Sequence, residues 1–142
     1  MTESTATSVW HGSLREGRGR TSFGTGAVPE VGATWAARAG TPDGGTTPEE
    51  LLAAAHATCF GMALAAGLSR DGHPPEELRV QATCTFDPAG PSVTAMALVV
   101  DGAVPGVDGP AFQQAAAAAK DGCPISKALA GNVAVTLRAT LR

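Results

Sequence analysis

The longest uncharged stretch of the chain constrains its fold more than any other feature. From Leu51 to Ser69, 19 residues pass without an Asp, Glu, Lys or Arg side chain. That length is compatible with a membrane span, but seven of the 19 residues are alanine and five more are small or polar. No second apolar span occurs in the sequence. We therefore interpret the stretch as a buried helix of a folded protein, enclosed by a sheet, by other helices or by another subunit.

The residues at the two ends of this stretch predict where the helix begins and ends. Thr47 is suited to be the N-cap, Pro48 to the first helical position, and Glu50 to the last position of a capping box. A Gly and two prolines follow in the order that usually terminates a helix. The helix is therefore predicted over residues 48–72, with Glu50 explained by the cap.

The rest of the chain alternates between strand and helix patterns. The first 45 residues are rich in Gly and turns and predict short strands or hairpins around residues 9–14, 21–28 and 33–37. Apolar alternation predicts strands over 78–86, 92–101 and 133–141, the second of them central. Helices are predicted from Asp108 to Gly122 and from Cys123 to about Ala130. We expect one α+β domain over residues 1–142, in which antiparallel strands enclose the long helix.

Composition narrows the possible partners. The 142 residues carry a formal net charge of -3, with no dense Lys/Arg block, which disfavours nucleic acid and anionic membranes as partners. Residues 1–12 have no signal-peptide pattern, so a cytoplasmic location is expected. Three cysteines are too few for a disulfide scaffold, and three scattered histidines give little support to a zinc site. No cofactor or metal is indicated.

The three cysteines differ in their predicted settings. Cys123 falls at the N-cap of a short helix, where backbone N–H groups favour a thiolate, although a small apolar filler is an equal alternative. Cys59 lies in the middle of the long helix, where a free cysteine is usually an inert core residue. Cys84 lies on the apolar side of a strand and is expected in the core.

Charged and titratable residues near Cys59 offer candidates for a site. His56 precedes Cys59 by one helical turn, so it is either a base for the thiol or a packed, hydrogen-bonded histidine. Glu49 is not required by the helix cap. Arg38 is expected in a short strand before the long helix, whereas Arg18 and Arg20 crowd a Gly-rich hairpin together with Arg15 and are expected to be mostly solvated.

Three segments of the sequence closely resemble the signatures of the OsmC/Ohr family of bacterial thiol peroxidases. They are residues 47–64 (TPEELLAAAHATCFGMAL), residues 104–108 (VPGVD) and residues 122–126 (GCPIS). The first is long and unusual in composition, and a weaker similarity extends over nearly the whole chain. His56 favours the OsmC-type branch of the family.

The resemblance implies a fold and a set of roles. It implies a homodimer of intertwined α+β subunits, with sites at the subunit interface. Cys59 matches the peroxidatic cysteine of the family and Cys123 the resolving one, while Glu49 matches a glutamate that pairs with an arginine beside the reactive thiol. Arg38 is the best match for that arginine, with Arg18 and Arg20 as alternatives.

The activity that the resemblance implies is reduction of organic hydroperoxides to alcohols. Cys59 becomes a sulfenic acid, Cys123 condenses with it to a disulfide, and a dithiol, of the lipoyl type in this family, restores the thiols. A non-catalytic stress or binding protein with the same fold is the alternative function. A thioredoxin-like enzyme is disfavoured because the two cysteines lie 64 positions apart.

Helix geometry indicates how such a site is assembled. Glu49 and Cys59 are 10 positions apart, which is about 15 Å of rise and roughly 80° of rotation on one helix. Glu49 is therefore expected to reach the thiol of the other subunit rather than that of its own chain.

Overall fold

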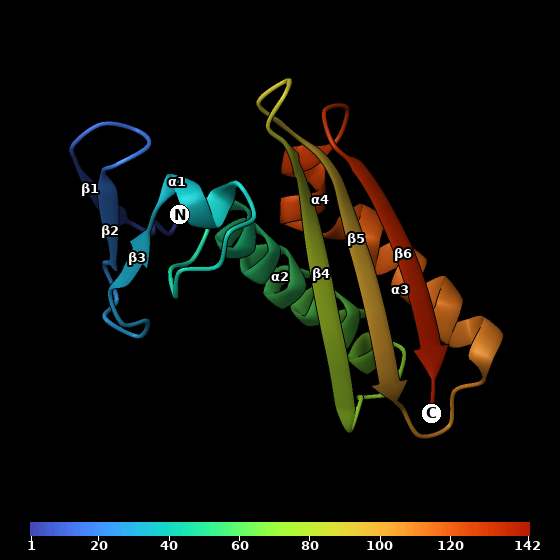
Figure 1. Cartoon of the computed structure of the whole chain (residues 1–142). Helices are drawn as coiled ribbons and strands as arrows, with labels where there is room; N and C mark the ends of the chain where they lie inside the picture. Colours follow the sequence, from blue (N-terminus) through green and yellow to red (C-terminus); the bar gives the residue numbers. More distant parts are fainter. The chain divides into compact units, whose positions relative to one another are not determined.

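The computed structural model describes all residues from Met1 to Arg142 and divides them into two compact units, 1–51 and 52–142 (Figure 1). The single domain expected from the sequence stays a prediction, and each unit is described by itself.

The N-terminal unit is a small antiparallel sheet followed by a short helix. Strands β1 (Ala6–His11), β2 (Arg18–Phe23) and β3 (Val31–Ala33) pair in the order β1-β2-β3. Helix α1 (Trp35–Arg38) comes next, because the side chain of Thr34 accepts a hydrogen bond from the N–H of Ala37 and starts a helical turn. The strand expected over 33–37 is therefore wrong beyond its first residue, and Arg38 ends a helix.

Helix α2 (Pro48–Arg70) is the predicted long helix and begins at the predicted residue. The hydroxyl of Thr47 accepts a hydrogen bond from the N–H of Glu50 at 3.0 Å, which confirms the N-cap. The reciprocal half of the capping box is absent, because the carboxylate of Glu50 accepts a hydrogen bond from the hydroxyl of Thr46.

The C-terminal unit contains a sheet whose strands have the order β4-β5-β6. Strands β4 (Glu77–Asp87) and β5 (Ser92–Ala103) form an antiparallel hairpin, with β5 in the centre as predicted. Strand β6 (Ala134–Leu141) pairs with β5 in parallel, so the expectation of antiparallel strands is wrong for this pair. The connection from β5 to β6 contains two helices, which is the long crossover that a parallel pair requires.

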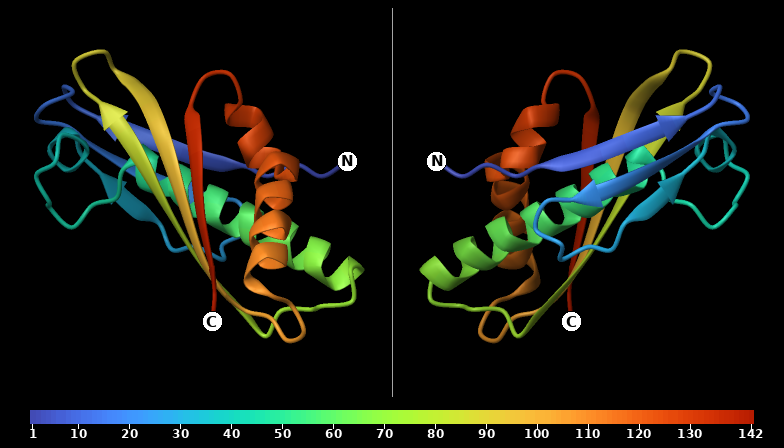
Figure 2. Two further views of the ribbon diagram at one scale, coloured as in Figure 1. Left: turned by 90° about the vertical axis from the view of Figure 1, so that its right-hand side faces the viewer. Right: turned by 90° about the vertical axis from the view of Figure 1, so that its left-hand side faces the viewer.

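Those two helices are α3 (Gly109–Gly122) and α4 (Pro124–Leu129), and both match their predicted positions. The side chain of Asp108 caps α3 by accepting a hydrogen bond from the N–H of Ala111, and Cys123 occupies the N-cap of α4. In the views of Figures 1 and 2, α3, α4 and the C-terminal part of α2 cover one face of the β4–β6 sheet.

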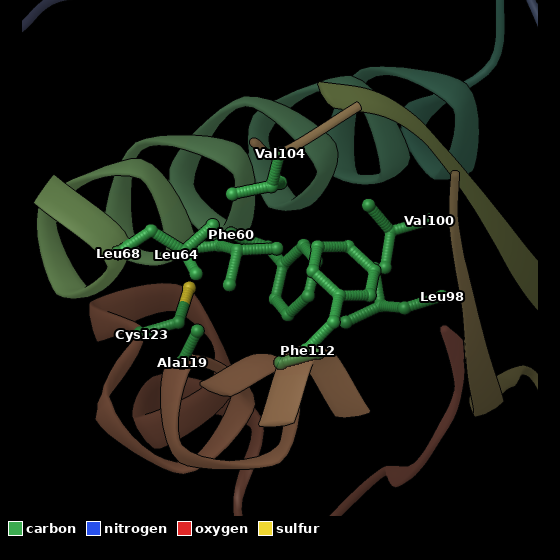
Figure 3. Close-up of a cluster of buried hydrophobic side chains, with 10 residues drawn as sticks. Phe60, Leu64, Leu68, Leu98, Val100, Val104, Phe112, Ala119 and Cys123 are labelled. Atoms are coloured by element: carbon green, nitrogen blue, oxygen red, sulfur yellow. The ribbon is translucent and has the colours of Figure 1, made fainter. Parts of the chain in front are cut away.

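The core of the C-terminal unit lies between α2, α3 and this sheet (Figure 3). Phe60 from α2 and Phe112 from α3 are fully buried and point toward each other, with Leu98 and Val100 of β5 beside them. Gly102 of β5 allows this packing, because a Cβ at that position would lie 2.5 Å from the ring of Phe112. The α+β class with a long central helix is confirmed.

Only one stripe of α2 is buried within the chain. His56, Phe60, Leu64 and Leu68 are buried, spaced by four residues along the helix, whereas Met62 is 69% exposed. By length and composition alone α2 is apolar enough to cross a membrane, a test that core helices also meet. The buried stripe packed against β5 and α3 favours the core helix.

Candidate functional site

Two of the three cysteines come together from distant parts of the sequence. Cys59 lies in the middle of α2 and Cys123 at the start of α4, and their Sγ atoms are 3.1 Å apart. Both are free thiols; Cys123 is fully buried and Cys59 is partly exposed. A disulfide requires about 2.05 Å between sulfurs, so a two-electron oxidation could join them with an approach of only about 1 Å.

The surroundings shift the pKa values of these two thiols in opposite directions. Burial raises the pKa of Cys59, and the neighbouring Cys123 raises it further against one hydrogen bond from the Ile125 N–H. Burial also disfavours the Cys123 thiolate, but hydrogen bonds from the Ser126 N–H, the Cys59 thiol, the Ser126 hydroxyl and the Ile125 N–H outweigh it and lower the pKa of Cys123. Between the two neutral thiols, Cys123 donates to Cys59. When Cys123 loses its proton, the thiol of Cys59 donates to it instead, which is one reason why the pKa of Cys123 is lowered.

A buried polar pair lies one turn away from the cysteines on the same two helices. Nε2 of His56 is 2.8 Å from Oγ of Ser126, and both residues are buried. Nδ1 of His56 has no hydrogen-bond partner in the protein. Burial lowers the pKa of His56 and so favours the neutral ring. Of the two sequence-based alternatives, the structure shows the packed, hydrogen-bonded histidine, with a partner on another helix.

In the N-terminal unit, Arg38 and Glu49 form an ion pair. Nη2 of Arg38 donates to Oε1 of Glu49 at 2.7 Å, and Nε donates to Oε1 at 3.0 Å and to Oε2 at 3.3 Å. The carboxylate of Glu49 is buried, whereas the side chain of Arg38 is 33% exposed. The first turn of α2 also places the positive end of the helix dipole beside Glu49. The guanidinium is therefore held in a fixed orientation.

The other two candidate arginines have different surroundings. Arg20 pairs with Glu30 on the exposed surface of the hairpin. Arg18 contributes to a lowered pKa of Asp43, a shift that is caused mainly by hydrogen bonds from the Thr34 hydroxyl and the Gly45 N–H. Of the three arginines, Arg38 is the one that pairs with Glu49.

The third cysteine and the threonine that precedes Cys59 have surroundings of their own in the C-terminal unit. Cys84 is half-buried on the inward side of β4, among the apolar residues of that strand. The hydroxyl of Thr58, next to Cys59 in sequence, donates to the carbonyl of Ala54 at 2.9 Å. No group of three or more His, Cys, Asp or Glu side chains is placed to hold a metal ion.

Ser126 is the site residue that our sequence analysis did not single out. It follows Cys123 by three residues, as His56 precedes Cys59 by three. A serine one turn after an N-terminal cysteine is on the same helix face as that cysteine. This spacing was the available signal, and only the packing of α4 on α2 identifies His56 as the partner.

Comparison with known proteins assigns the chain to a family. The family described as OsmC-like protein matches residues 40–138. Peroxiredoxin OsmC of Escherichia coli (strain K12) is 36% identical over 126 residues, which is 87% of this chain and 87% of that protein. The protein of the same name from Shigella flexneri is equally similar. The chain belongs to the OsmC-like family.

Solved structures agree with this assignment. The organic hydroperoxide resistance protein OhrB of Bacillus subtilis is 29% identical with a TM-score of 0.69, and the alignment covers 97% of this chain and 98% of that one. An organic hydroperoxide resistance protein from Elizabethkingia anophelis has the same fold, with a TM-score of 0.77 at 24% identity and 99% of both chains covered. The OsmC/Ohr fold predicted from the sequence is confirmed.

Proposed function

We propose that this protein is a cysteine-based peroxidase that reduces organic hydroperoxides to alcohols. Homology to a protein named peroxiredoxin supports a peroxidase-type function. The observation that carries the finer proposal is the pair of free thiols, 3.1 Å between sulfurs, of which one is partly exposed and the other fully buried.

The difference in exposure divides the two roles. A peroxide reaches the partly exposed Cys59 more readily than the buried Cys123, so Cys59 attacks first. Its sulfur displaces the alcohol from the distal peroxide oxygen and becomes a sulfenic acid. Cys123 is already within contact distance and condenses with this sulfenic acid to a disulfide. An external dithiol, of the lipoyl type, then restores both thiols.

Cys59 requires a cation to act as a nucleophile near neutral pH. Burial raises its pKa, and within the C-terminal unit no lysine or arginine side chain offsets this effect. We propose that Arg38, oriented by its ion pair with Glu49, supplies the positive charge beside the thiolate. Glu49 and Cys59 are 10 residues apart on α2, which is about 15 Å along the helix. The Arg38–Glu49 ion pair that reaches each Cys59 thiol would therefore come from the second subunit of a homodimer.

The exposed surface of α2 supports such a homodimer. Met62 is 69% exposed although it is one of the large apolar residues of the chain. It lines an open groove of about 480 Å³ between α2 and β4, together with Thr58, Leu78 and Val80. A second copy of α2 packed against this surface would remove apolar area from water at about 25 cal/mol per Å². Both the dimer and a cytoplasmic location belong to this proposal.

Single-turnover experiments on two variants test the roles of the cysteines. Cys59→Ser is expected to abolish consumption of cumene hydroperoxide. Cys123→Ser is expected to consume one equivalent and to leave a sulfenic acid that overoxidises. If both variants lose the first turnover equally, the assignment of the two roles is contradicted. If wild type also fails to consume the hydroperoxide, the non-catalytic alternative is favoured.

A mixed dimer tests the shared site. Cys59→Ser and Glu49→Gln chains, each inactive alone, are co-expressed with different tags and purified as a heterodimer. A shared site combines an intact Glu49 with an intact Cys59 and restores about half of the wild-type activity if the two sites of a C2 dimer act independently. A heterodimer as inactive as its parents would show that Glu49 does not act across subunits.

A further inference from the structure

The buried pair of His56 and Ser126 is not used by the peroxide-reducing step. His56 is fully buried and Ser126 is 8% exposed. Burying polar groups is unfavourable unless they find partners. These two find each other at 2.8 Å, one helical turn from the cysteines. Their placement therefore points to a role at the sulfur pair.

The hydrogen-bond directions in this cluster follow from the chemistry of Cys123. Hydrogen bonding from the Ser126 hydroxyl is one of the effects that lower the pKa of Cys123, so this hydroxyl donates to the sulfur once Cys123 is a thiolate. The hydroxyl hydrogen is then committed to sulfur, so the oxygen of Ser126 must accept from His56, and the ring carries its hydrogen on Nε2. Nδ1 is left without a hydrogen, which fits a nitrogen that has no acceptor in the protein. The result is a chain of donors from His56 through Ser126 to Cys123.

We infer that His56 and Ser126 are positioning residues for the resolving step, which hold Cys123 ready to attack the oxidised Cys59. This inference rests on the proposed peroxidase function. The geometry supports it in two ways. The pair joins α2 to α4, the two helices that carry the cysteines, and each member lies one helical turn from a cysteine of the pair whose Sγ atoms are 3.1 Å apart. The pair contributes nothing to the attack of Cys59 on peroxide.

The step itself is a condensation. The electron pair of the Cys123 sulfur forms an S–S bond with the sulfenic sulfur of Cys59 while the S–O bond breaks. Hydroxide leaves and takes up the proton that Cys123 gave up, so that one water is formed. Cys123 is oxidised and the sulfenic sulfur is reduced. A slower condensation leaves the sulfenic acid exposed to a second peroxide, which converts it to sulfinic acid.

Matched variants separate positioning from general stability. His56→Gln places an amide N–H close to the position of Nε2 and is expected to keep the hydrogen bond, whereas His56→Asn places its amide near the position of Nδ1 and is expected to lose it. Ser126→Ala removes the link to both partners, and Ser126→Thr retains the hydroxyl. Each protein is treated with cumene hydroperoxide, quenched with a thiol-blocking reagent at several times, and analysed by intact mass and peptide mapping.

The expected result is a change in one step only. His56→Asn and Ser126→Ala lose the Cys59 thiol at the wild-type rate, form the Cys59–Cys123 disulfide about tenfold more slowly, and accumulate sulfinic acid at Cys59. His56→Gln and Ser126→Thr recover most of the wild-type ratio of disulfide to sulfinic acid. Adding His56→Asn to Ser126→Ala causes no further loss, because the chain of donors is already broken.

Two results would overturn the inference. Unchanged ratios in both His56→Asn and Ser126→Ala would show that the pair has no role in resolution. Parallel slowing of thiol loss and disulfide formation, without recovery in the conservative variants, would show a general structural role. If wild-type protein never loses the Cys59 thiol, the proposed function fails and this inference with it, whereas normal wild-type turnover with unchanged variants removes this inference alone.

Discussion

Removing the positive partner of Glu49 should destabilise the protein more than removing Glu49 itself. Arg38→Met deletes hydrogen bonds of 2.7, 3.0 and 3.3 Å and leaves a carboxylate buried at 7% exposure. Breaking a fully buried ion pair by removing one partner costs about 3–5 kcal/mol. Here the helix N-terminus still favours the carboxylate, and the side chain of Arg38 is 33% exposed. We therefore expect Arg38→Met to lower the free energy of unfolding by about 2 kcal/mol.

The reverse change should cost less. Glu49→Gln leaves a partly exposed guanidinium that water can solvate, and the amide oxygen of the glutamine can still accept one hydrogen bond. We therefore expect this variant to lose about 1 kcal/mol of unfolding free energy. In Arg38→Met/Glu49→Gln no charge is left buried, and the double variant should lose about 1.5 kcal/mol rather than the additive 3 kcal/mol. The coupling free energy between the two side chains is therefore about 1.5 kcal/mol.

Urea unfolding of the four proteins at one pH and one protein concentration measures this cycle. The concentration is fixed because association would add to the apparent stability. Arg20 and Glu30 provide the control pair in the same N-terminal unit, with side chains 64% and 46% exposed, and their cycle should give a coupling near zero. Additive losses for Arg38 and Glu49, or equal coupling in both cycles, would refute the reasoning that burial makes the first pair strong.

Three further predictions follow from the packing and the pKa shifts. Gly102→Ala should cost about 1–3 kcal/mol in urea unfolding, because its Cβ would lie 2.5 Å from Phe112; Phe112→Leu in the same chain should recover part of that loss, and no recovery would contradict the clash. Burial lowers the pKa of His56 below the value of about 6.5 that the residue has in the unfolded chain. As the pH falls below this value, the unfolded chain binds a proton at His56 more readily than the folded protein, so the free energy of unfolding decreases by at most about 1.4 kcal/mol per pH unit. Wild type should therefore lose more stability than His56→Gln between pH 7 and 5, and parallel losses would contradict this. Cumene hydroperoxide should give a higher kcat/KM than hydrogen peroxide, since Ile125 beside the cysteines is apolar and packs against the core; the opposite order would argue against an apolar pocket.

The sequence predicted well those features that depend on neighbours in the chain. The cap at Thr47, the start of α2 at Pro48 and the alternation of β4 each arise from residues within a few positions of one another. The same holds for Cys123 at the N-cap of α4. Local chemistry fixes these features, and so the sequence was sufficient to predict them.

Features that depend on distant pairing could not be predicted in the same way. A strand of period two has the same pattern whether its neighbour is parallel or antiparallel, so β6 gave no sign of its parallel pairing with β5. The segment that carries Arg38 is too short for periodicity, and the cap at Thr34 decided its conformation. Ser126 acquires a partner only through the packing of α4 on α2, 70 positions from His56.

The pairing of Cys59 and Cys123 as one redox unit is the central claim, and counting thiols tests it most directly. Wild-type protein is treated with one equivalent of cumene hydroperoxide, and free thiols are counted under denaturing conditions before and after. Three thiols should fall to one, and the peptide map should join Cys59 to Cys123 and leave Cys84 free. Three unchanged thiols, or a disulfide that includes Cys84, would contradict the claim.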